Sequence, residues 1–440
     1  MDLNRRELMI GAAAAAAGAL ASPALAADPV QIEMFFPVPV QGALAAQMQK
    51  LIARFNQEHA DIVVTGAYTG SYDDTNLKTR AAIKAGKPPA LALMSANFVR
   101  EYAINDEAEP FDDLIVSGGS TADAFFQRFW TPLHPNARID GKAYGVPFQN
   151  STPLLYYSVD AFKDAGLDPE RPPVDWGEWL AAAQKLTKAD GSRVGLMFPG
   201  TYDYCGWLTS GLAMANGGQY YNHEYGGEVF YDAPSTVGAL SFLDALVNGA
   251  KAVPPGVSDA NACTTAFFSG RTGMMMLSTG ALSFVRSGMK SPYKVAFLPK
   301  ALRHAAPIGG GSLICPKGNS PERRAAAWTL VQWLTSPEVA GEWSRFTGYF
   351  APNKQAYELP EMKTFLSEHP DAKVALDQLQ HAVPWFDTFQ VVAVRKAMED
   401  QVQAILSGAA KPAEAAAKAQ RAAEALLAPY VNQTALKSWA

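Results

Sequence analysis

The sequence predicts an α/β protein with two lobes. Between residues 30 and 100, short apolar runs alternate with amphipathic segments of helical period, a pattern typical of a parallel sheet covered by helices. The chain has 440 residues, enough for two or three domains. We find no Pro/Ser-rich linker that would separate two consecutive domains. The chain is therefore expected to cross between its lobes more than once.

The first hundred residues contain the clearest elements. An apolar-alternating run at 30–36 predicts the first strand. The segment 45–60 predicts a helix, because Met48, Leu51, Ile52 and Phe55 recur at helical spacing. Three further elements complete the alternation: a strand at 62–64, a helix at 77–85 that Gly86-Lys87-Pro88-Pro89 ends, and the apolar stretch 90–94.

The middle and end of the chain are predicted in less detail. Residues 144–157 are aromatic and interrupted by prolines, and a short helix at 158–165 ends at Gly166. Asp175 is a suitable N-cap for the helix that follows it. Three more helices are expected at 237–248, 325–334 and 409–427, the last an Ala-rich surface helix with a narrow packed stripe.

Residues 1–26 have the pattern of an export signal. Arg5 and Arg6 precede an Ala/Gly-rich apolar run, and Ala24-x-Ala26 supplies the small residues of a cleavage site. The run from 8 to 21 is too short for the roughly 20 residues that span a bilayer. The paired arginines favour twin-arginine export over the Sec route. Since no cysteine lies near the cleavage site, we expect a mature periplasmic protein without a lipid anchor.

The charge and the cysteines exclude several kinds of partner. With 37 Lys and Arg against 42 Asp and Glu, the net charge is -5, which argues against nucleic-acid binding. Cys205, Cys263 and Cys315 are widely spaced and form no zinc pattern. Three buried free thiols are favoured over a single disulfide. We expect no metal and no cofactor.

Motif searches predict binding rather than catalysis. The six histidines are scattered, and the nucleophile-elbow and phosphate-loop patterns are missing. Instead, several loops combine small residues with a hydroxyl group, which suits recognition of an oxyanion or a polyol. These loops are Gly70-Ser71-Tyr72, Asn150-Ser151-Thr152, Ser278-Thr279-Gly280, 309–312 and Thr347-Gly348-Tyr349.

Four stretches carry a family resemblance. They are STPLLYY at 151–157, DAFKDAGLDP at 160–169 with Trp176 beyond it, MLSTGAL at 276–282 and IGGGSL at 308–313. With Thr347-Gly348-Tyr349 and the surroundings of Arg395, they resemble the extracellular solute-binding proteins of ABC importers. The similarity lies in the large carbohydrate-binding family, most closely its glycerol-3-phosphate branch. It extends from about Val30 to Leu427.

This resemblance implies the architecture and the partners. The periplasmic-binding-protein fold has two α/β lobes joined by a multi-segment hinge, with the ligand between them. We expect residues 27–149 and 281–335 in the first lobe and residues 150–280 and 336–440 in the second. The expected partners are a small ligand and the permease subunits of an ABC importer, and the expected state is a monomer that is not an enzyme.

The resemblance also implies a set of binding residues. The family positions correspond to Tyr72, Ser151, Ser278, Gly310, Tyr349 and Arg395. Arg395 would offer a planar charged fork to a phosphate, while the hydroxyl groups and the Gly310 N–H would complete the polar shell. Tyr204 and Trp207 are candidates for the altered aromatic floor. The alternative for Arg395 is a surface ion pair with Glu399 at i+4.

One departure from the family affects the ligand. Ala96 stands where the family has an acid that accepts hydrogen bonds from glycerol hydroxyls, so either the polyol half of the pocket is changed or Asn97 or Asp203 accepts those bonds. We expect a small phosphorylated polyol, glycerol-3-phosphate or a glycerophosphodiester. A neutral sugar or oligosaccharide is the alternative, and an exported hydrolase is a less favoured one.

Overall fold

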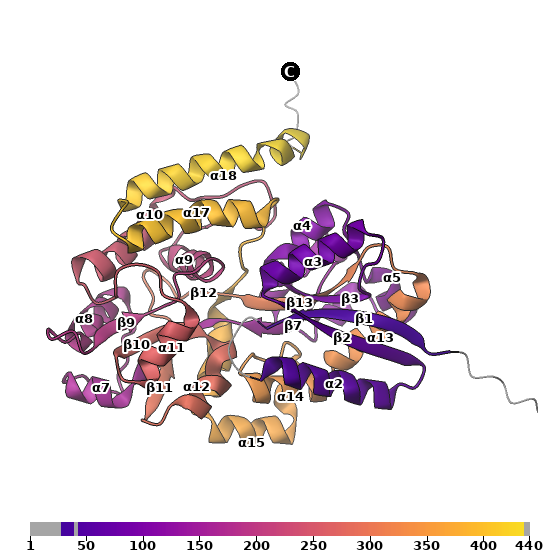
Figure 1. The fold of residues 1–440 in the computed structure, drawn as a ribbon, viewed down its shortest axis with the longest axis horizontal. Coiled ribbons are helices and arrows are strands. Elements are labelled where there is room, and N and C mark those ends of the chain that lie inside the picture. Colours follow the sequence, from indigo (N-terminus) through magenta and orange to yellow (C-terminus); the bar gives the residue numbers. More distant parts are fainter. Residues whose placement is uncertain (1–27, 39–42, 435–440) are drawn as a thin grey trace, which may run out of the picture.

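The chain folds into two lobes that lie side by side, each built around one β-sheet (Figure 1). The computed structural model describes residues 28–38 and 43–434. The expected export signal at 1–26 lies outside these residues. Within the described part of the chain, no helix is both long and apolar enough to cross a membrane.

The first lobe contains a six-stranded sheet in the order β2-β1-β3-β13-β4, with β7 also paired to β13. The strands β1, β2 and β3 are parallel, as predicted, but β13 runs antiparallel to β3, β4 and β7. The sheet is therefore mixed, because β13 enters from the second lobe in the opposite direction. The strands are β1 (Val30–Pro37), β2 (Ile62–Gly70), β3 (Leu91–Ser95), β4 (Ala108–Glu109), β7 (Val146–Ser151) and β13 (Gly309–Pro316).

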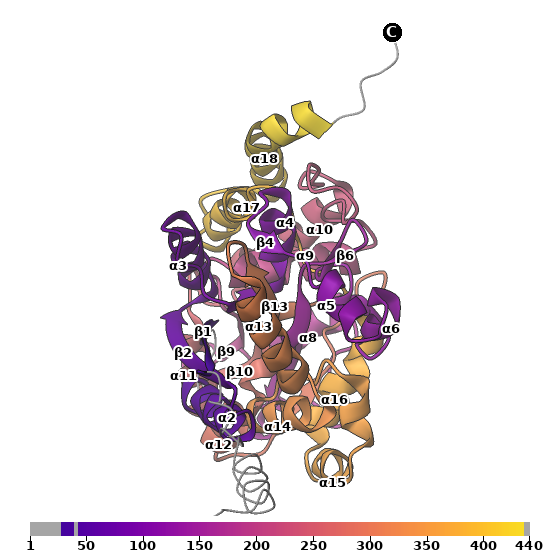
Figure 2. The ribbon, with the colours of Figure 1, turned by 90° about the vertical axis from the view of Figure 1, so that its right-hand side faces the viewer.

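The predicted helices of the first lobe form, but two begin earlier than predicted, and one of these is α13, which begins at Pro321 rather than at residue 325. Helix α2 (Leu44–Glu58) buries the predicted stripe of Met48, Leu51, Ile52 and Phe55. Helix α3 (Tyr72–Lys84) begins five residues before the predicted start. Ser71 and Asp74 form a capping box at that end, which satisfies free N–H groups of the first turn. Figure 2 looks onto this lobe, with α2 and α3 on one side and α5 and α6 on the other.

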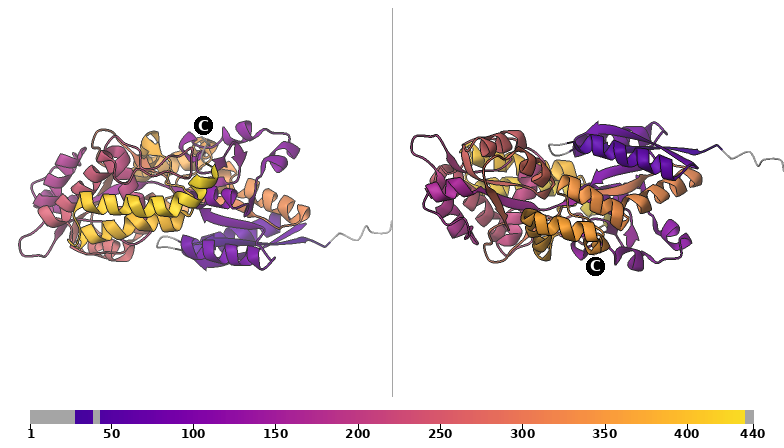
Figure 3. Two further views of the ribbon diagram at one scale, coloured as in Figure 1. Left: turned by 90° about the horizontal axis from the view of Figure 1, so that it is seen from above. Right: turned by 90° about the horizontal axis from the view of Figure 1, so that it is seen from below.

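The second lobe contains a four-stranded sheet in the order β11-β8-β10-β9. The predicted helix start at Asp175 is confirmed, since its side chain accepts from Glu178 N and caps α8. The helices predicted to begin at 237 and 409 begin instead at Pro234 and Pro412. At the other end of the lobe, α17 and α18 pack together over α9 and α10 (Figure 3). As expected, α18 buries only a narrow stripe that is mostly alanine. The strands are β8 (Pro153–Ser158), β9 (Val194–Met197), β10 (Thr272–Ser278) and β11 (Tyr293–Ala296).

The helices have the following bounds. In the first lobe they are α4 (Val99–Ile104), α5 (Asp112–Ser117), α6 (Ala122–Phe126), α13 (Pro321–Leu334) and α14 (Pro337–Thr347). The others are α7 (Val159–Asp164), α8 (Trp176–Leu186), α9 (Tyr204–Ala215), α10 (Pro234–Asp244), α11 (Ala260–Phe268), α12 (Leu282–Gly288), α15 (Pro360–Glu368), α16 (Pro370–Asp377), α17 (Val391–Leu406) and α18 (Pro412–Thr434).

Two of the expected lobe boundaries are wrong. Strand β11 pairs with β8, so the chain stays with the second sheet beyond residue 281, the expected crossing point. Helix α14 packs with the first lobe, where Trp343 lies 5.5 Å from Phe148 between ring centroids, so that lobe extends beyond residue 335. The chain crosses between the sheets at Thr152, between β11 and β13, and after α14. These crossings bring the ends of several strands to one place.

Candidate functional site

A small pocket lies where the two lobes meet. Its cavity volume is about 50 Å³, enough for a few water molecules at roughly 10–15 Å³ each. Seven of the eight residues predicted from the sequence line it, and Arg395 does not. The lining residues are Tyr72, Ser151, Asp203, Tyr204, Trp207, Ser278, Gly309, Gly310, Tyr349 and Trp385.

Strand pairing places the serine and the glycines of the pocket. Gly309 at the start of β13 pairs with Ser151 at the end of β7. A Cβ atom on Gly309 would lie 2.7 Å from the Trp207 ring, so the glycine makes room for that ring. Gly310 has φ +81°, and a Cβ atom there would lie 1.8 Å from the Gln149 carbonyl oxygen. Only glycine fits this position.

The tyrosines Tyr72 and Tyr349 are fixed by their local structure. Tyr72 is the first residue of α3, and its hydroxyl accepts from Gln149 Nε2 at 3.0 Å. Tyr349 follows Gly348, the left-handed C-cap of α14, and its ring packs against Gly280, where a Cβ atom would come within 2.5 Å. Burial raises the pKa of both phenols, so both remain neutral and can donate hydrogen bonds.

Three further rings form the wall on the side of the second lobe. Tyr204 and Trp207 come from α9, and Trp385 comes from the segment before α17. The ring centroid of Trp207 lies 6.0 Å from Tyr204 and 6.4 Å from Trp385, both in edge-on arrangements. Trp207 Nε1 donates to the carbonyl oxygens of Pro307 and Ile308, at 3.2 Å each. Trp207 is therefore held in one orientation by the strand-crossing segment.

Arg395 lies behind the pocket wall and is engaged by protein carboxylates. Its guanidinium pairs with Asp203 at 2.9 Å, Asp73 at 3.1 Å and Glu399 at 3.3 Å. The i+4 pair with Glu399 exists, but it is buried rather than on the surface, since Arg395 is 3% exposed. Burial alone lowers the pKa of Arg395, but the three carboxylates outweigh it and raise that pKa above its ordinary value. The guanidinium of Arg395 was expected to be free for a phosphate, but protein carboxylates occupy it.

Two acids around Arg395 have raised pKa values, whereas an ordinary ion pair lowers the pKa of its acid. Burial raises the pKa of Asp203 to about 6, against the lowering effect of Arg395 and with repulsion from Asp73. Burial likewise raises the pKa of Glu399 to about 7, although Arg395 lowers it. Both pKa values rise because burial removes water from the carboxylates, and the positive charge of one guanidinium is too small to offset that loss for several carboxylates at once.

Ala96 does not lie at the pocket wall. It is 1% exposed in the turn after β3, and it is not among the residues that line the cavity. Asp203, named from the sequence as a possible substitute acceptor, lines the pocket instead. Of the two interpretations of the missing acid, the geometry favours replacement of the family's acid by Asp203.

Sequence reasoning missed Trp385, and it named Gly309 only as part of the loop 309–312. Trp385 lies in an irregular segment, where no periodicity marks it, and only its proximity in sequence to Arg395 could have suggested it. The three cysteines are confirmed as free, buried thiols. Among the described residues, no group of three or more His, Cys, Asp and Glu is arranged to hold a metal ion.

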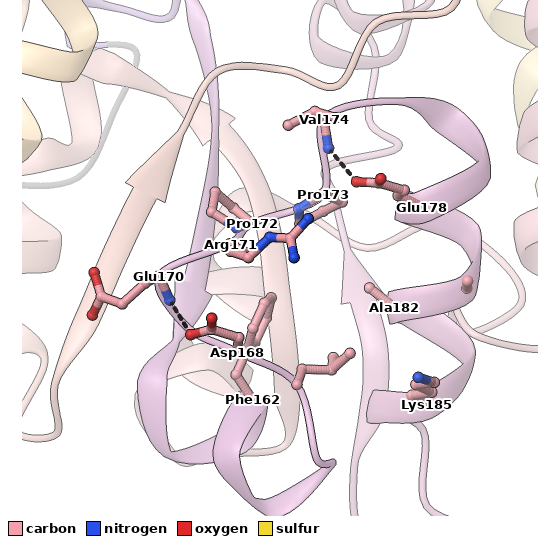
Figure 4. A pocket seen from close by; sticks show the side chains of 12 residues that line it. Phe162, Asp168, Glu170, Arg171, Pro172, Pro173, Val174, Glu178, Ala182 and Lys185 are labelled. Atoms are coloured by element: carbon pink, nitrogen blue, oxygen red, sulfur yellow. Dashed lines mark hydrogen bonds between the residues drawn. The ribbon is translucent and has the colours of Figure 1, made fainter.

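A larger hollow lies elsewhere, on the second lobe. This outer groove has a cavity volume of about 520 Å³ and is lined by residues between Phe162 and Lys185 (Figure 4). Two of its acids bond locally: Asp168 accepts from Glu170 N, and Glu178 accepts from Val174 N, both visible as dashed lines. The groove therefore lacks the convergence of distant segments found between the lobes.

Comparison with known proteins agrees with this geometry. A family model described as bacterial extracellular solute-binding protein matches residues 50–374. The sn-glycerol-3-phosphate-binding periplasmic protein UgpB of Pectobacterium atrosepticum is 28% identical over 419 residues, which cover 90% of this chain and 91% of that protein. UgpB of Escherichia coli strain 536 is 27% identical over 418 residues, covering 90% and 92%.

Solved structures share the fold. UgpB from Mycobacterium tuberculosis in complex with glycerophosphocholine has a TM-score of 0.80 at 24% identity, covering 92% of this chain and 100% of that one. Maltose-bound MalE3 of T. maritima has a TM-score of 0.77 at 24% identity, covering 90% and 100%. The family model spans well over half of the sequence. The chain therefore belongs to the bacterial extracellular solute-binding proteins.

Proposed function

We propose that this chain is the periplasmic receptor of an ABC importer, and that it captures a small glycerol-based phosphate ester and delivers it to the permease. One observation carries the proposal. Seven of the eight binding residues predicted from the sequence line a single pocket between the lobes. The full-length similarity to glycerol-3-phosphate-binding relatives supports the same ligand class.

The lining of the pocket also supports a small polar ligand. Ser151, Ser278 and Tyr349 supply hydroxyl groups, and Arg395 lies one side chain behind the wall. A phosphate that replaces Asp203 on the guanidinium would gain charge-assisted hydrogen bonds.

The receptor performs no reaction in this proposal. Neither Ser151 nor Ser278 has a histidine, lysine or cysteine beside it among the described lining residues, so neither serine has a base that would activate it. The lobes would instead close on the ligand, and the closed form would be recognised by the permease subunits.

A neutral polyol or small sugar is the second candidate. The occupied state of Arg395 favours it, because a neutral ligand would not need to displace a carboxylate. Titration calorimetry with sn-glycerol-3-phosphate, glycerophosphodiesters, inorganic phosphate, glycerol and common monosaccharides separates the two. We expect binding of at least one glycerophosphate compound and none of the sugars. Binding of sugars alone would overturn the proposal.

A further inference from the structure

A buried amide holds the backbone of one ring in the pocket wall. Trp385 lines the pocket, but it stands in residues 384–388, which belong to no helix or strand. Side chains therefore satisfy its backbone: Asn136 Oδ1 accepts from Trp385 N at 2.9 Å, and Asn136 Nδ2 donates to Trp385 O at 2.8 Å. The amide of Asn136 thus takes the place of a neighbouring strand.

The amide and the ring belong to different sides of the pocket. Asn136 directly precedes Ala137, which is part of the core of the first lobe. Trp385 stands in the wall on the side of the second lobe, edge-on to Trp207. Tyr221, between α9 and α10 of the second lobe, donates its hydroxyl to the same Trp385 O at 2.7 Å. The carbonyl group of Trp385 therefore accepts a hydrogen bond from each lobe.

The contact of Asn136 extends to a buried ion pair. Asn136 Nδ2 also donates to Asp387 Oδ2 at 3.2 Å, and Arg100 Nε of α4 lies 3.3 Å from Asp387 Oδ1. Arg100 Nη2 donates in turn to His223 O at 2.5 Å. Asn136, Asp387 and Arg100 are all buried, so little water competes for these bonds, and the bonds fix the segment that carries Trp385.

The indole group of Trp385 differs from its neighbour in one respect. Trp207 Nε1 already donates to the carbonyl oxygens of Pro307 and Ile308. Trp385 Nε1 is buried and has no hydrogen-bond partner among the residues that the structure describes. A buried donor without a partner is unfavourable, and a polar ligand in the pocket that Trp385 lines would supply an acceptor. The exact place of this ring therefore matters for binding.

We infer that Asn136 is a positioning residue of the receptor: from the first lobe, it sets the place of the Trp385 ring in the wall on the side of the second lobe. Asn136 does not line the pocket, so it acts on a ligand through Trp385. Loss of its amide takes partners from the N–H and the C=O of Trp385, and the ring loses its single placement. The inference rests on the proposed function for its effect on affinity, but not for its effect on the ring.

Two equally buried asparagines provide matched variants. N136A removes the amide that bonds Trp385. N353A is the control, because Asn353 is also 1% exposed and donates to Thr335 O at 2.9 Å, but neither residue lines the pocket. Both variants should lose stability to urea, since each loses a buried amide. N136S, whose single hydroxyl cannot bond both backbone groups of Trp385 at once, replaces N136A if that variant does not fold.

Fluorine NMR of the full chain labelled with 5-fluorotryptophan tests the place of the ring without any ligand. The resonance of Trp385 is the one that is missing in W385F. It should be single in wild type and in N353A, and it should broaden or split in N136A. A single resonance at the wild-type position in N136A would overturn the inference.

Titration calorimetry with glycerophosphocholine and sn-glycerol-3-phosphate tests the consequence for binding. We expect N136A to weaken binding about tenfold or more, and N353A to leave it within about twofold of wild type. In W385A, which lacks the ring, N136A should add less than about twofold, because both changes act through the same side chain. Equal losses in N136A and N353A, or an undiminished effect of N136A in W385A, would overturn the inference. Failure of wild type to bind either probe would overturn the proposed function, while the fluorine spectra would still decide the role of Asn136.

Discussion

The interlobe pocket and the outer groove differ in how the chain builds them. The groove comes from one stretch, between residues 162 and 185, and two of its acids, Asp168 and Glu178, accept from backbone N–H groups two and four positions away. The pocket draws on segments spread from Tyr72 to Trp385, and its partners are hundreds of residues apart, as in the bonds from Arg395 to Asp73 and Asp203. Convergence of distant polar groups identifies the site better than volume, because the groove is the larger hollow.

Substitution of an arginine in each region should give the largest difference in the free energy of unfolding, with the greater loss at Arg395. R395A leaves the buried Glu399 and the partly buried Asp203 without their cation, and loss of one partner of a buried ion pair costs about 3–5 kcal/mol. We expect the lower end of that range, because Asp73 is 40% exposed. Urea unfolding of R395A and wild type measures this loss in the free energy of unfolding.

The control for R395A is R171A in the outer groove, where the arginine is exposed. A surface substitution of this kind should change the free energy of unfolding by less than about 0.5 kcal/mol. An R395A protein as stable as wild type would contradict the view that Arg395 joins distant segments.

Buried acids beside the pocket should make stability depend on pH. Asp387 is 1% exposed, and burial raises its pKa to about 7, although Arg100 at 3.3 Å lowers it. An acid whose pKa is raised by folding binds more protons in the native state than in the unfolded state. Its contribution to stability is complete below about pH 4 and is lost as the pH rises through about 7.

We therefore expect the melting temperature to fall by several degrees between pH 5.5 and pH 8. D387N cannot ionise and should show a smaller fall than wild type. Glu399 shifts in the same direction, so part of the dependence should remain in D387N. A wild-type melting temperature that is unchanged or rises over this interval would contradict the raised pKa values.

The same comparison explains what the sequence could predict. Local signals were sufficient for α2, whose apolar stripe is buried as expected, and for the Asp175 cap of α8. Motifs of the family located the lining of the pocket, because Ser151, Ser278 and Gly310 each stand in a recognisable loop. The lobe boundaries could not be predicted from local sequence, since they depend on the pairing of β11 with β8, two strands that lie far apart in the sequence.

The charges of the site were the least predictable part. Arg395 stands in a helix with Glu399 at i+4, and that pair is visible in the sequence. Its pair with Asp73 joins the two lobes, whereas its pair with Asp203 lies within the second lobe, and nothing in the spacing of these residues indicates either pair. A residue's type therefore indicated its chemistry, whereas its partners, which decide whether that chemistry is available, came from the fold.

Replacing one glycine in each region by alanine should give a smaller difference in stability between the pocket and the outer groove. Gly310 and Gly166 both have positive φ, +81° and +68°. An alanine at Gly166, beside the outer groove, meets no atom within 4 Å, so G166A should cost only the left-handed strain of roughly 1–2 kcal/mol.

G310A adds a clash with the backbone of Gln149, and it should cost more than G166A and also weaken ligand binding. Chemical unfolding and calorimetry of the two variants measure both effects. Equal losses of stability with unchanged binding in G310A would show that the strand contact at Gly310 tolerates a side chain, contrary to the geometry.

Removal of one hydroxyl group should have the smallest effect on stability, and its effect on affinity tests the site itself. S151A removes only the Oγ atom of a residue that is 2% exposed and keeps its Cβ atom, so the packing changes little. If Ser151 donates to a phosphate oxygen of a glycerophosphate ligand, its loss costs about 1.5–3 kcal/mol of binding, roughly a ten- to hundredfold weaker affinity. R171A, which removes a cation from the outer groove, should leave the affinity within about twofold of wild type, because that groove takes no part in binding. A loss of affinity in R171A with none in S151A would move the binding site from the interlobe pocket to the groove.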